Sequence, residues 1–243
     1  MKIDYREILS RCEERAYLIS MTPLEQLVRI GYEAGMCAGS AVLDLCCGYG
    51  EMLKIWHEAF GAKGVGVDIC EEFIEAGRAR LQAAGITGIT LKLGDVRKLE
   101  SAQRYDFVSC TEIFGSFGQT VDLLAGHLKP GGKLLMSSRY SKTEQPSREL
   151  VDFEGETLSL SQINAVFRSR GFYLTAMASC GDNEWERYIM WSARRHLATL
   201  RKNLGTAAHA WCDTWYDTYF GFRRAYEGFA TFVAEREKEV LHD

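Results

Sequence analysis

Short apolar runs alternate with helical patterns from residue 41 to residue 138, and this alternation constrains the fold more than any other feature of the chain. The expected strands are AVLDL (41–45), GVGVD (64–68), ITLKL (89–93), YDFVSC (105–110) and KLLMSS (133–138), with helical patterns near 50–60, 71–84 and 117–128. Strands that are apolar on both faces belong in a parallel sheet covered by helices on both sides. The sequence therefore predicts an α/β fold with a doubly wound sheet.

The first forty residues show a helical pattern, and TPLE at 22–25 is a helix start signal. We expect Thr22 to cap this helix, Pro23 to occupy its first position and Glu25 to close a capping box.

The second half of the chain departs from regular alternation. SRYSKTEQPSRELVDF, after the fifth strand, is polar and is predicted to form a loop. A helix near 160–170, a sixth strand at 172–179 and a last strand at 228–235 follow. Roughly fifty residues rich in Trp, Tyr and Arg separate the last two strands, too many for a plain connection, and we expect two helices broken near Asn203–Gly205. The expected organisation is an N-terminal helical cap (1–40), a core (41–180), a helical insertion or lid (181–227) and the last strand with its tail (228–243).

Composition excludes several classes of protein. No apolar run approaches the roughly 20 residues that span a bilayer, and the N-terminus lacks the pattern of a secretory signal. A net charge of -4 does not suit a nucleic-acid partner. The eight cysteines contain no C-x-x-C pair and no zinc-finger spacing, so they predict reduced thiols and no metal site. We expect a cytoplasmic protein with no membrane partner.

A glycine turn follows the first strand, where a doubly wound sheet normally binds its ligand. In VLDLCCGYGEM, Gly48 and Gly50 let the backbone approach a ligand closely. A dinucleotide fingerprint needs a third glycine where this chain has Leu53, and no G-K-[ST] follows for a P-loop. Both phosphate-binding interpretations are therefore weakened.

Three acids fall at the ends of three successive strands: Asp44 at the first, Asp68 at the second and Asp95 shortly after the third. Asp68, at the end of the second strand, is placed to accept hydrogen bonds from ribose hydroxyls. Asp95 would lie near an adenine amine, and Asp44 could receive an amine or order the turn. Three carboxylates favour a cationic ligand over a pyrophosphate.

The ordered motifs VLDLCCGYG, GVGVDIC, GDVRKL, YDFVSCTEIF and LKPGGKLLMSS resemble those of the class I S-adenosylmethionine-dependent methyltransferases. The resemblance covers about residues 40 to 138. It implies S-adenosylmethionine as the cofactor and a Rossmann-like sheet of seven strands, mostly parallel, with an antiparallel last strand. Cys46 stands where the family has its first glycine. The cofactor site implied by the motifs comprises Asp44, Cys46, Gly48, Gly50, Asp68, Ile69, Asp95, Val96 and Cys110.

The aromatic tail is similar to a helical insertion in a bacterial group of these methyltransferases that is thought to act on small molecules. Trp185, Tyr188 and Trp191 recur on one helix face, and this spacing suits core packing and the lining of an active site equally. Trp185 and Trp191 are therefore candidate substrate residues.

The expected reaction is in-line methyl transfer to a small molecule. Glu112 and Tyr188 are candidate bases, and Arg139 and Tyr140, after the fifth strand, are candidates to hold an anionic group of the substrate. Three alternatives stay open: a protein-directed methyltransferase, a non-catalytic adenosyl-ligand-binding protein and a nicotinamide oxidoreductase. The sequence does not indicate an oligomeric state.

Overall fold

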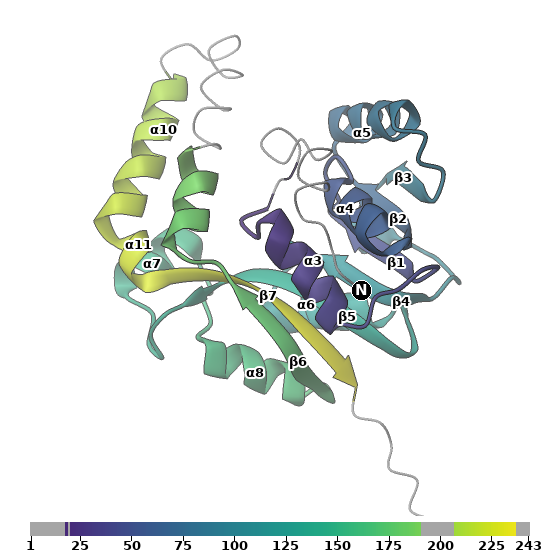
Figure 1. Ribbon diagram of the computed structural model, residues 1–243. Helices are drawn as coiled ribbons and strands as arrows, with labels where there is room; N and C mark the ends of the chain where they lie inside the picture. Colours follow the sequence, from purple (N-terminus) through teal and green to yellow (C-terminus); the bar gives the residue numbers. More distant parts are fainter. Residues whose placement is uncertain (1–17, 19, 191–206, 237–243) are drawn as a thin grey trace, which may run out of the picture.

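A seven-stranded sheet with the order β3-β2-β1-β4-β5-β7-β6 forms the centre of the molecule (Figure 1). The computed structural model describes residues 18, 20–190 and 207–236. Every pair of neighbouring strands is parallel except those made by β7, which runs antiparallel to β5 and β6. This confirms the predicted fold. The strands are β1 (Ala41–Leu45), β2 (Lys63–Asp68), β3 (Ile89–Leu93), β4 (Tyr105–Cys110), β5 (Leu128–Ser141), β6 (Phe172–Ser179) and β7 (Glu227–Arg236).

Strand β5 is much longer than the predicted 133–138. Its antiparallel pairing with β7 continues without interruption from Lys133, opposite Glu235, to Ser141, opposite Glu227. A long partner keeps the polar end of the strand in the sheet, so polarity alone wrongly placed its end. Arg139 therefore lies inside β5 rather than just past it.

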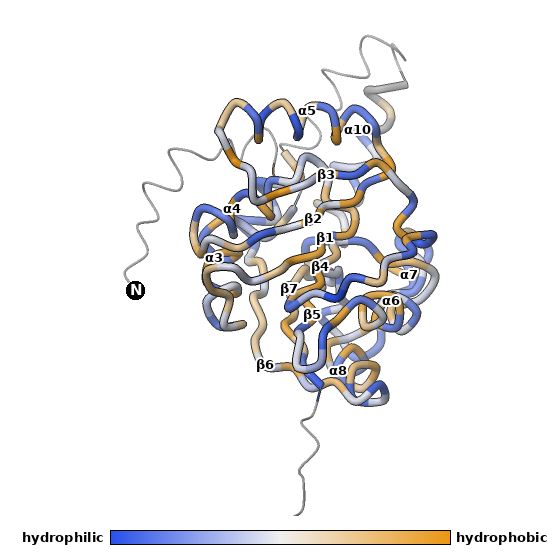
Figure 2. Tube along the Cα trace, turned by 90° about the vertical axis from the view of Figure 1, so that its right-hand side faces the viewer, coloured by the Kyte–Doolittle hydropathy of each residue, from blue (hydrophilic) through white to orange (hydrophobic). Residues whose placement is uncertain are grey.

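Helices cover both faces of the sheet (Figure 2). One core cluster joins the sheet to α3, α4 and α5, and the other joins it to α6 and α8. Val42 belongs to the first cluster and its neighbour Leu43 to the second, as expected where side chains alternate between the faces of a strand. These helices are α3 (Leu24–Glu33), α4 (Glu51–Phe60), α5 (Glu71–Ala83), α6 (Phe117–Ala125) and α8 (Leu160–Arg168), and a short 3-10 turn, η1 (Val96–Lys98), follows β3.

The start of α3 differs from the predicted capping box. Pro23 takes the N-cap position and the side chain of Thr22 makes no cap. Instead, the Thr22 hydroxyl lies 2.8 Å from the Thr231 hydroxyl, which lies 2.8 Å from that of Ser137. These buried contacts between hydroxyls connect the start of the helix to the sheet. They engage the Thr22 side chain, which therefore does not cap the helix as its local sequence predicted.

A short helix, α7 (Arg148–Glu154), lies in the segment predicted to be a loop. The Ser147 hydroxyl accepts a hydrogen bond from the Leu150 amide, the Leu150 side chain is fully buried, and Gly155 ends the helix. Ser147 in PSREL is a helix-capping residue, but the polar residues around it favoured the prediction of a loop.

Helical segments lie between β6 and β7 (Figure 1). Residues 182–190 are helical, and α10 (Ala207–Thr218) continues through one turn of π-helix, η2 (Tyr219–Arg223), into α11 (Arg224–Tyr226). The predicted break near Asn203–Gly205 lies outside the described residues. Within the described part of the chain, no helix has the length and apolar character needed to cross a membrane.

Candidate functional site

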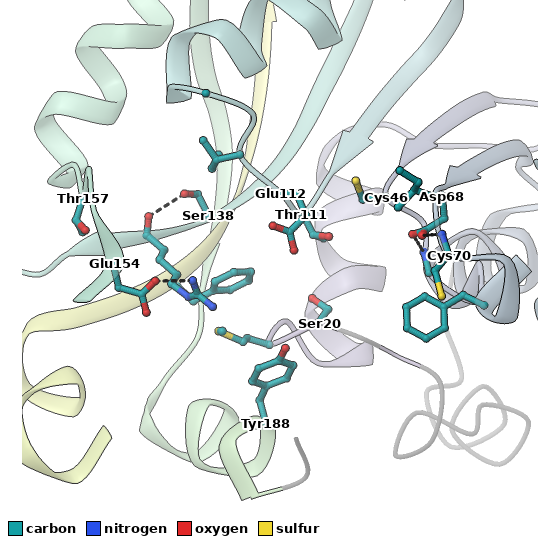
Figure 3. Close-up of a pocket in the computed structure, with 18 of the residues that line it drawn as sticks. Ser20, Cys46, Asp68, Cys70, Thr111, Glu112, Ser138, Glu154, Thr157 and Tyr188 are labelled. Carbon is teal, nitrogen blue, oxygen red and sulfur yellow. Dashed lines mark hydrogen bonds and ion pairs between the residues drawn. The ribbon is translucent and has the colours of Figure 1, made fainter. Parts of the chain in front are cut away.

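A cavity of about 610 Å³ opens at the carboxyl ends of the central strands (Figure 3). Its Asp68 end is lined by Cys46, Gly48, Asp68, Ile69 and Cys70, and its Glu154 end by Arg139, Glu154, Glu156 and Thr157. Figure 3 shows Thr111 and Glu112 between the two ends. This is the switch point of the sheet, where β1 lies between β2 and β4, and doubly wound sheets bind ligands there.

The glycine turn forms the wall of the Asp68 end. Gly48 and Gly50 have φ of 53° and 74°, in the left-handed region that glycine enters without strain. Cys46 has φ of 61° and is the only non-glycine residue with positive φ in the described ranges. The backbone therefore keeps the shape that a glycine would allow, with a thiol facing the cavity. Cys47, next to it, is buried in the core, as a packing residue would be.

Asp68 braces the turn and faces the cavity. Its Oδ2 accepts a hydrogen bond from the Gly48 amide at 2.8 Å, and its Oδ1 accepts one from the Cys70 amide at 2.9 Å. Each carboxylate oxygen has a second lone pair, so both can also accept from a vicinal diol. Beside Asp68, the Ile69 side chain is 70% exposed, an apolar surface at the cavity that a flat ligand would cover.

Asp44 lies behind the turn and does not line the cavity. It is 2% exposed, and its Oδ1 accepts a hydrogen bond from the Ser109 hydroxyl at 2.6 Å. Burial raises the pKa of Asp44 to about 7, the Ser109 hydrogen bond opposes this rise, and the charge of Asp68 adds to it. Of the two expected roles, this position favours ordering the turn.

Asp95 and Val96 lie outside the cavity lining. Both Asp95 oxygens accept hydrogen bonds at 2.9 Å from the guanidinium of Arg97, and hydrogen bonds from Arg97 lower the pKa of Asp95 to about 2. Val96 is buried in the core. Their assignment to the cofactor stays a prediction.

Glu112 follows β4 and faces the middle of the cavity. The buried Cys110 shapes its loop, since the Cys110 thiol lies 3.3 Å from the Glu112 carbonyl oxygen and 3.5 Å from its amide nitrogen. Burial raises the pKa of Glu112, Arg139 lowers it and Asp68 adds to the rise. Cys110 thus positions the loop rather than lining the cavity.

A ring of four charged side chains forms the Glu154 end. Arg139 Nη1 lies 2.7 Å from Glu154 Oε2, and Arg139 Nε lies 3.4 Å from Glu227 Oε1. Behind them, Arg223 Nε lies 2.7 Å from Glu227 Oε2, and Arg223 Nη2 lies 3.0 Å from Glu154 Oε1. The side chains of Arg223 and Glu227 are fully buried. This ring links β5, α7, η2 and β7.

The aromatic candidates separate into two groups. Tyr188 lines the cavity, and Figure 3 shows its ring reaching toward it from the helix at 182–190. Trp185 is 1% exposed, its indole N–H donates to the Glu227 carbonyl at 3.3 Å, and its ring packs edge-on against Tyr219. Trp185 is therefore a core residue. Tyr140 is also buried in the core, and Trp191 lies outside the described residues.

The residues that α7 brings to the site were not predicted from the sequence. Glu154 ends α7, and Glu156 and Thr157 follow it along the cavity wall. The signal that could have found them was the Ser147 cap. Ser20 and Met21, which also line the cavity, carry no pattern that indicates a site.

Comparison with known proteins places this geometry in a family. A family model described as a methyltransferase domain matches residues 42–132. YjhP of Escherichia coli strain K12 is 27% identical over 173 residues, which are 68% of this chain and 70% of YjhP. A crystal structure of a SAM-dependent methyltransferase from Thiobacillus denitrificans, in complex with S-adenosyl-L-homocysteine, matches with a TM-score of 0.81 at 25% identity, covering 98% of this chain and 100% of that one. The chain is a class I S-adenosylmethionine-dependent methyltransferase.

A further relative of this methyltransferase has a named pathway. The ubiquinone/menaquinone biosynthesis C-methyltransferase UbiE of Pseudomonas fluorescens strain Pf0-1 is 31% identical over 171 residues, which are 67% of this chain and 61% of UbiE. The matched family model of this methyltransferase ends at residue 132, before Arg139 and α7. The match therefore covers the motifs around Asp68 and leaves the Glu154 end outside it.

Proposed function

We propose that this methyltransferase binds S-adenosylmethionine at the Asp68 end of the cavity and transfers its methyl group to a small molecule bound at the Glu154 end. The observation that carries the proposal is the continuity of the cavity from Asp68 past Glu112 to Glu154. A donor and an acceptor in one continuous cavity can be aligned for in-line attack, which supplies much of the rate.

The residues at the Asp68 end fit an adenosyl group. Asp68 has lone pairs for the two ribose hydroxyls, and the exposed Ile69 side chain offers an apolar surface to the adenine. Gly48 lets the backbone approach the ligand, and Cys46 adds a thiol to the same wall. The bound cofactor supplies an activated methyl group on a sulfonium.

A small acceptor suits the remaining space. Small-molecule sites typically enclose about 300–1,000 Å³, and the cofactor would fill a large part of the 610 Å³ cavity. The name of the related UbiE also points to a small-molecule product. A net charge of -4 gives no support to a nucleic-acid acceptor.

Glu112 and Tyr188 are the side chains we assign to proton transfer. Both line the cavity, and burial raises the pKa of each. A carboxylate with a raised pKa is a stronger base than a solvated one, so Glu112 suits removal of a proton from an acceptor. Tyr188 is placed to orient that acceptor. Arg139 remains a candidate contact for its polar groups.

Calorimetric titration with S-adenosylmethionine tests the donor site. We expect Asp68→Ala to weaken binding at least about a hundredfold, since hydrogen bonds to a charged group contribute about 1.5–3 kcal/mol each. Glu72→Ala, which removes an exposed acid of α5, is the matched control and should bind normally. Undiminished binding by Asp68→Ala would refute the site.

Transfer of a labelled methyl group distinguishes the function from its alternatives. Label appearing in a low-molecular-weight fraction supports the proposal. Label appearing only in protein would favour a protein-directed enzyme, and binding without any transfer to metabolites or proteins would favour an adenosyl-ligand-binding protein.

A further inference from the structure

The Glu154 end of the cavity carries an excess of negative charge. Among the described residues that line the cavity, Glu112, Glu154 and Glu156 are the acids beyond Asp68, and Arg139 is the only basic residue. Three carboxylates against one guanidinium leave a formal charge of −2 in this part of the site. In a cleft lined by one sign of charge, the uncompensated charge favours a ligand of the opposite sign.

Arg139 does not offer a free positive charge to an anionic acceptor. It lies 2.7 Å from Glu154 and 3.4 Å from Glu227, and the buried Arg223 joins the same two carboxylates at 3.0 Å and 2.7 Å. The two arginines and two glutamates of this ring cancel. The excess negative charge therefore resides on Glu112 and Glu156.

Glu112 and Glu156 have no such compensation. In the described part of the chain, no basic side chain lies within salt-bridge distance of either carboxylate. Arg139 acts on Glu112 only at longer range, where it lowers the pKa less than burial raises it. Both residues thus line a cavity that, in the proposed function, also receives a cationic sulfonium, and the carboxylate of each can accept hydrogen bonds from an ammonium.

Aromatic side chains at the same place favour a cation as well. Tyr188 and Phe229 line the cavity beside Glu112 and Arg139. The face of an aromatic ring attracts ammonium groups, including those that carry methyl groups. The wall can therefore accommodate a nitrogen both before and after methylation.

We propose that the acceptor is a small amine that is recognised as an ammonium ion by Glu112 and Glu156 and methylated on nitrogen. This rests on the proposed function. The ammonium first gives one proton to the Glu112 carboxylate, which frees the nitrogen lone pair. That lone pair forms the nitrogen–carbon bond as the carbon–sulfur bond breaks, with the electron pair of the broken bond remaining on sulfur. The positive charge moves from sulfur to nitrogen, and Glu112 returns its proton to solvent.

Matched probes test the acceptor class on the protein saturated with S-adenosylhomocysteine. Benzylamine, benzyl alcohol and benzoate share one ring and differ in the reacting group, and propylamine, propan-1-ol and propanoate form an aliphatic set. At about pH 8 the amines are protonated. We expect saturable calorimetric binding of one of the amines and much weaker binding of its alcohol and acid. With S-adenosylmethionine, that amine should gain one labelled methyl group on nitrogen.

Variants connect the selectivity to the two carboxylates. Glu112→Gln and Glu156→Gln should each weaken amine binding about tenfold, equivalent to about 1.4 kcal/mol. The amine titrations use protein saturated with S-adenosylhomocysteine, so a change in cofactor affinity does not enter the comparison. Glu149→Gln, an exposed acid in the first turn of α7, is the control and should bind the amine normally. Glu112→Gln should also slow transfer when the amine is saturating, which a purely structural role would not produce.

Different measurements distinguish failure of the amine acceptor from failure of the proposed function. Three results, each obtained with normal S-adenosylmethionine binding, would overturn the amine acceptor and leave the donor site intact. They are preference for the alcohol or the acid, no binding of either amine, and unchanged amine affinity in both glutamate variants. Failure to bind S-adenosylmethionine overturns both.

Discussion

The two ends of the cavity are assembled in different ways. The Asp68 end comes from one turn–helix–strand segment, residues 46–70, and its hydrogen bonds stay within that segment. The Glu154 end combines Arg139 of β5, Glu154 of α7 and Arg223 of η2, which are far apart in the chain. The Asp68 end therefore depends on local backbone shape, whereas the Glu154 end also depends on ion pairs between distant segments.

This difference fits the role that we propose for each end. The cofactor of a methyltransferase is constant, so a short segment with fixed backbone geometry can specify its site. Acceptors differ between enzymes of one fold, and function resides in such locally variable sites. The ion pairs of the ring connect α7 and η2 to the sheet. They can hold the Glu154 end rigid, although this end lies outside the segment that the family model matches.

Breaking the ring should produce the largest effect. Arg223→Met keeps a long side chain but leaves Glu227 buried without its closest cationic partner. Loss of one partner of a buried ion pair costs about 3–5 kcal/mol. We therefore expect the free energy of unfolding, measured by urea denaturation, to fall by about that amount. The variant would also lose the guanidinium that lies 4.7 Å from the centre of the Trp215 ring.

The control for this change is Arg148→Met. Arg148 lies on α7 with its side chain 91% exposed and pairs with Asp152, so its loss should cost less than about 1 kcal/mol. If the two ends are independent, Arg223→Met should retain S-adenosylmethionine affinity at temperatures where it stays folded. Equal stability of the two variants would show that the ring contributes no more than a surface pair.

The strands and the turn around the Asp68 end could be predicted because their signals are local. Strands β1, β3, β4 and β6 have the predicted bounds, since their apolar runs are bounded by turns. The glycine turn lies after β1, where the sequence predicted it, and Gly48 and Gly50 have positive φ there. At Cys46, the departure from the family pattern changed the side chain and left the backbone conformation in place.

The Glu154 end could not be predicted in the same way. Nothing in the sequence pairs Arg139 with Glu227 or Arg223 with Glu154, because ion pairing between distant elements depends on the fold. Trp185 shows the same limit, since its helical spacing suited a site and the core equally and only the packing around it decided between them. Contacts between distant segments therefore decided the placement of side chains for which local sequence patterns allowed two positions.

A second variant should sharpen the contrast through pH. Burial raises the pKa of Asp44 to about 7, from 3.8. Because the folded protein holds this proton more tightly than the unfolded chain, the contribution of Asp44 to stability is full below about pH 4 and is lost as the pH rises through about 7. Asp44→Asn removes the titration and keeps an oxygen for Ser109. Relative to this variant, the wild type should lose up to about 4 kcal/mol between pH 4 and pH 8.

Asp106→Asn gives a control of opposite sign. Although burial opposes it, hydrogen bonds from the Ala41 amide and Lys129 lower the pKa of Asp106. Its contribution is present above the unfolded pKa and is lost as the pH falls through the folded value. Chemical denaturation across the same pH range checks both curves. Parallel curves for wild type and Asp44→Asn would show that Asp44 ionises as freely in the folded protein as in the unfolded chain.

The smallest effect is expected at the turn itself. Cys46 occupies the left-handed region at φ of 61°, which costs a residue with a Cβ about 1–2 kcal/mol. Cys46→Gly removes that strain. The greater freedom of glycine in the unfolded chain lowers the free energy of unfolding by about 0.4–1 kcal/mol and so offsets part of the gain. The net stabilisation should be about 0.5 kcal/mol, measurable as a shift in the midpoint of urea unfolding.

Cys37→Gly is the matched control for this turn, since Cys37 is exposed and has no positive φ. Without strain to relieve, that change should only destabilise. A loss of stability in Cys46→Gly as well would mean that the packing of the Cys46 thiol against the second core cluster outweighs the strain of its backbone. The local geometry of the Asp68 end would then depend on side-chain contacts, as the Glu154 end does, and the contrast between the two ends would narrow.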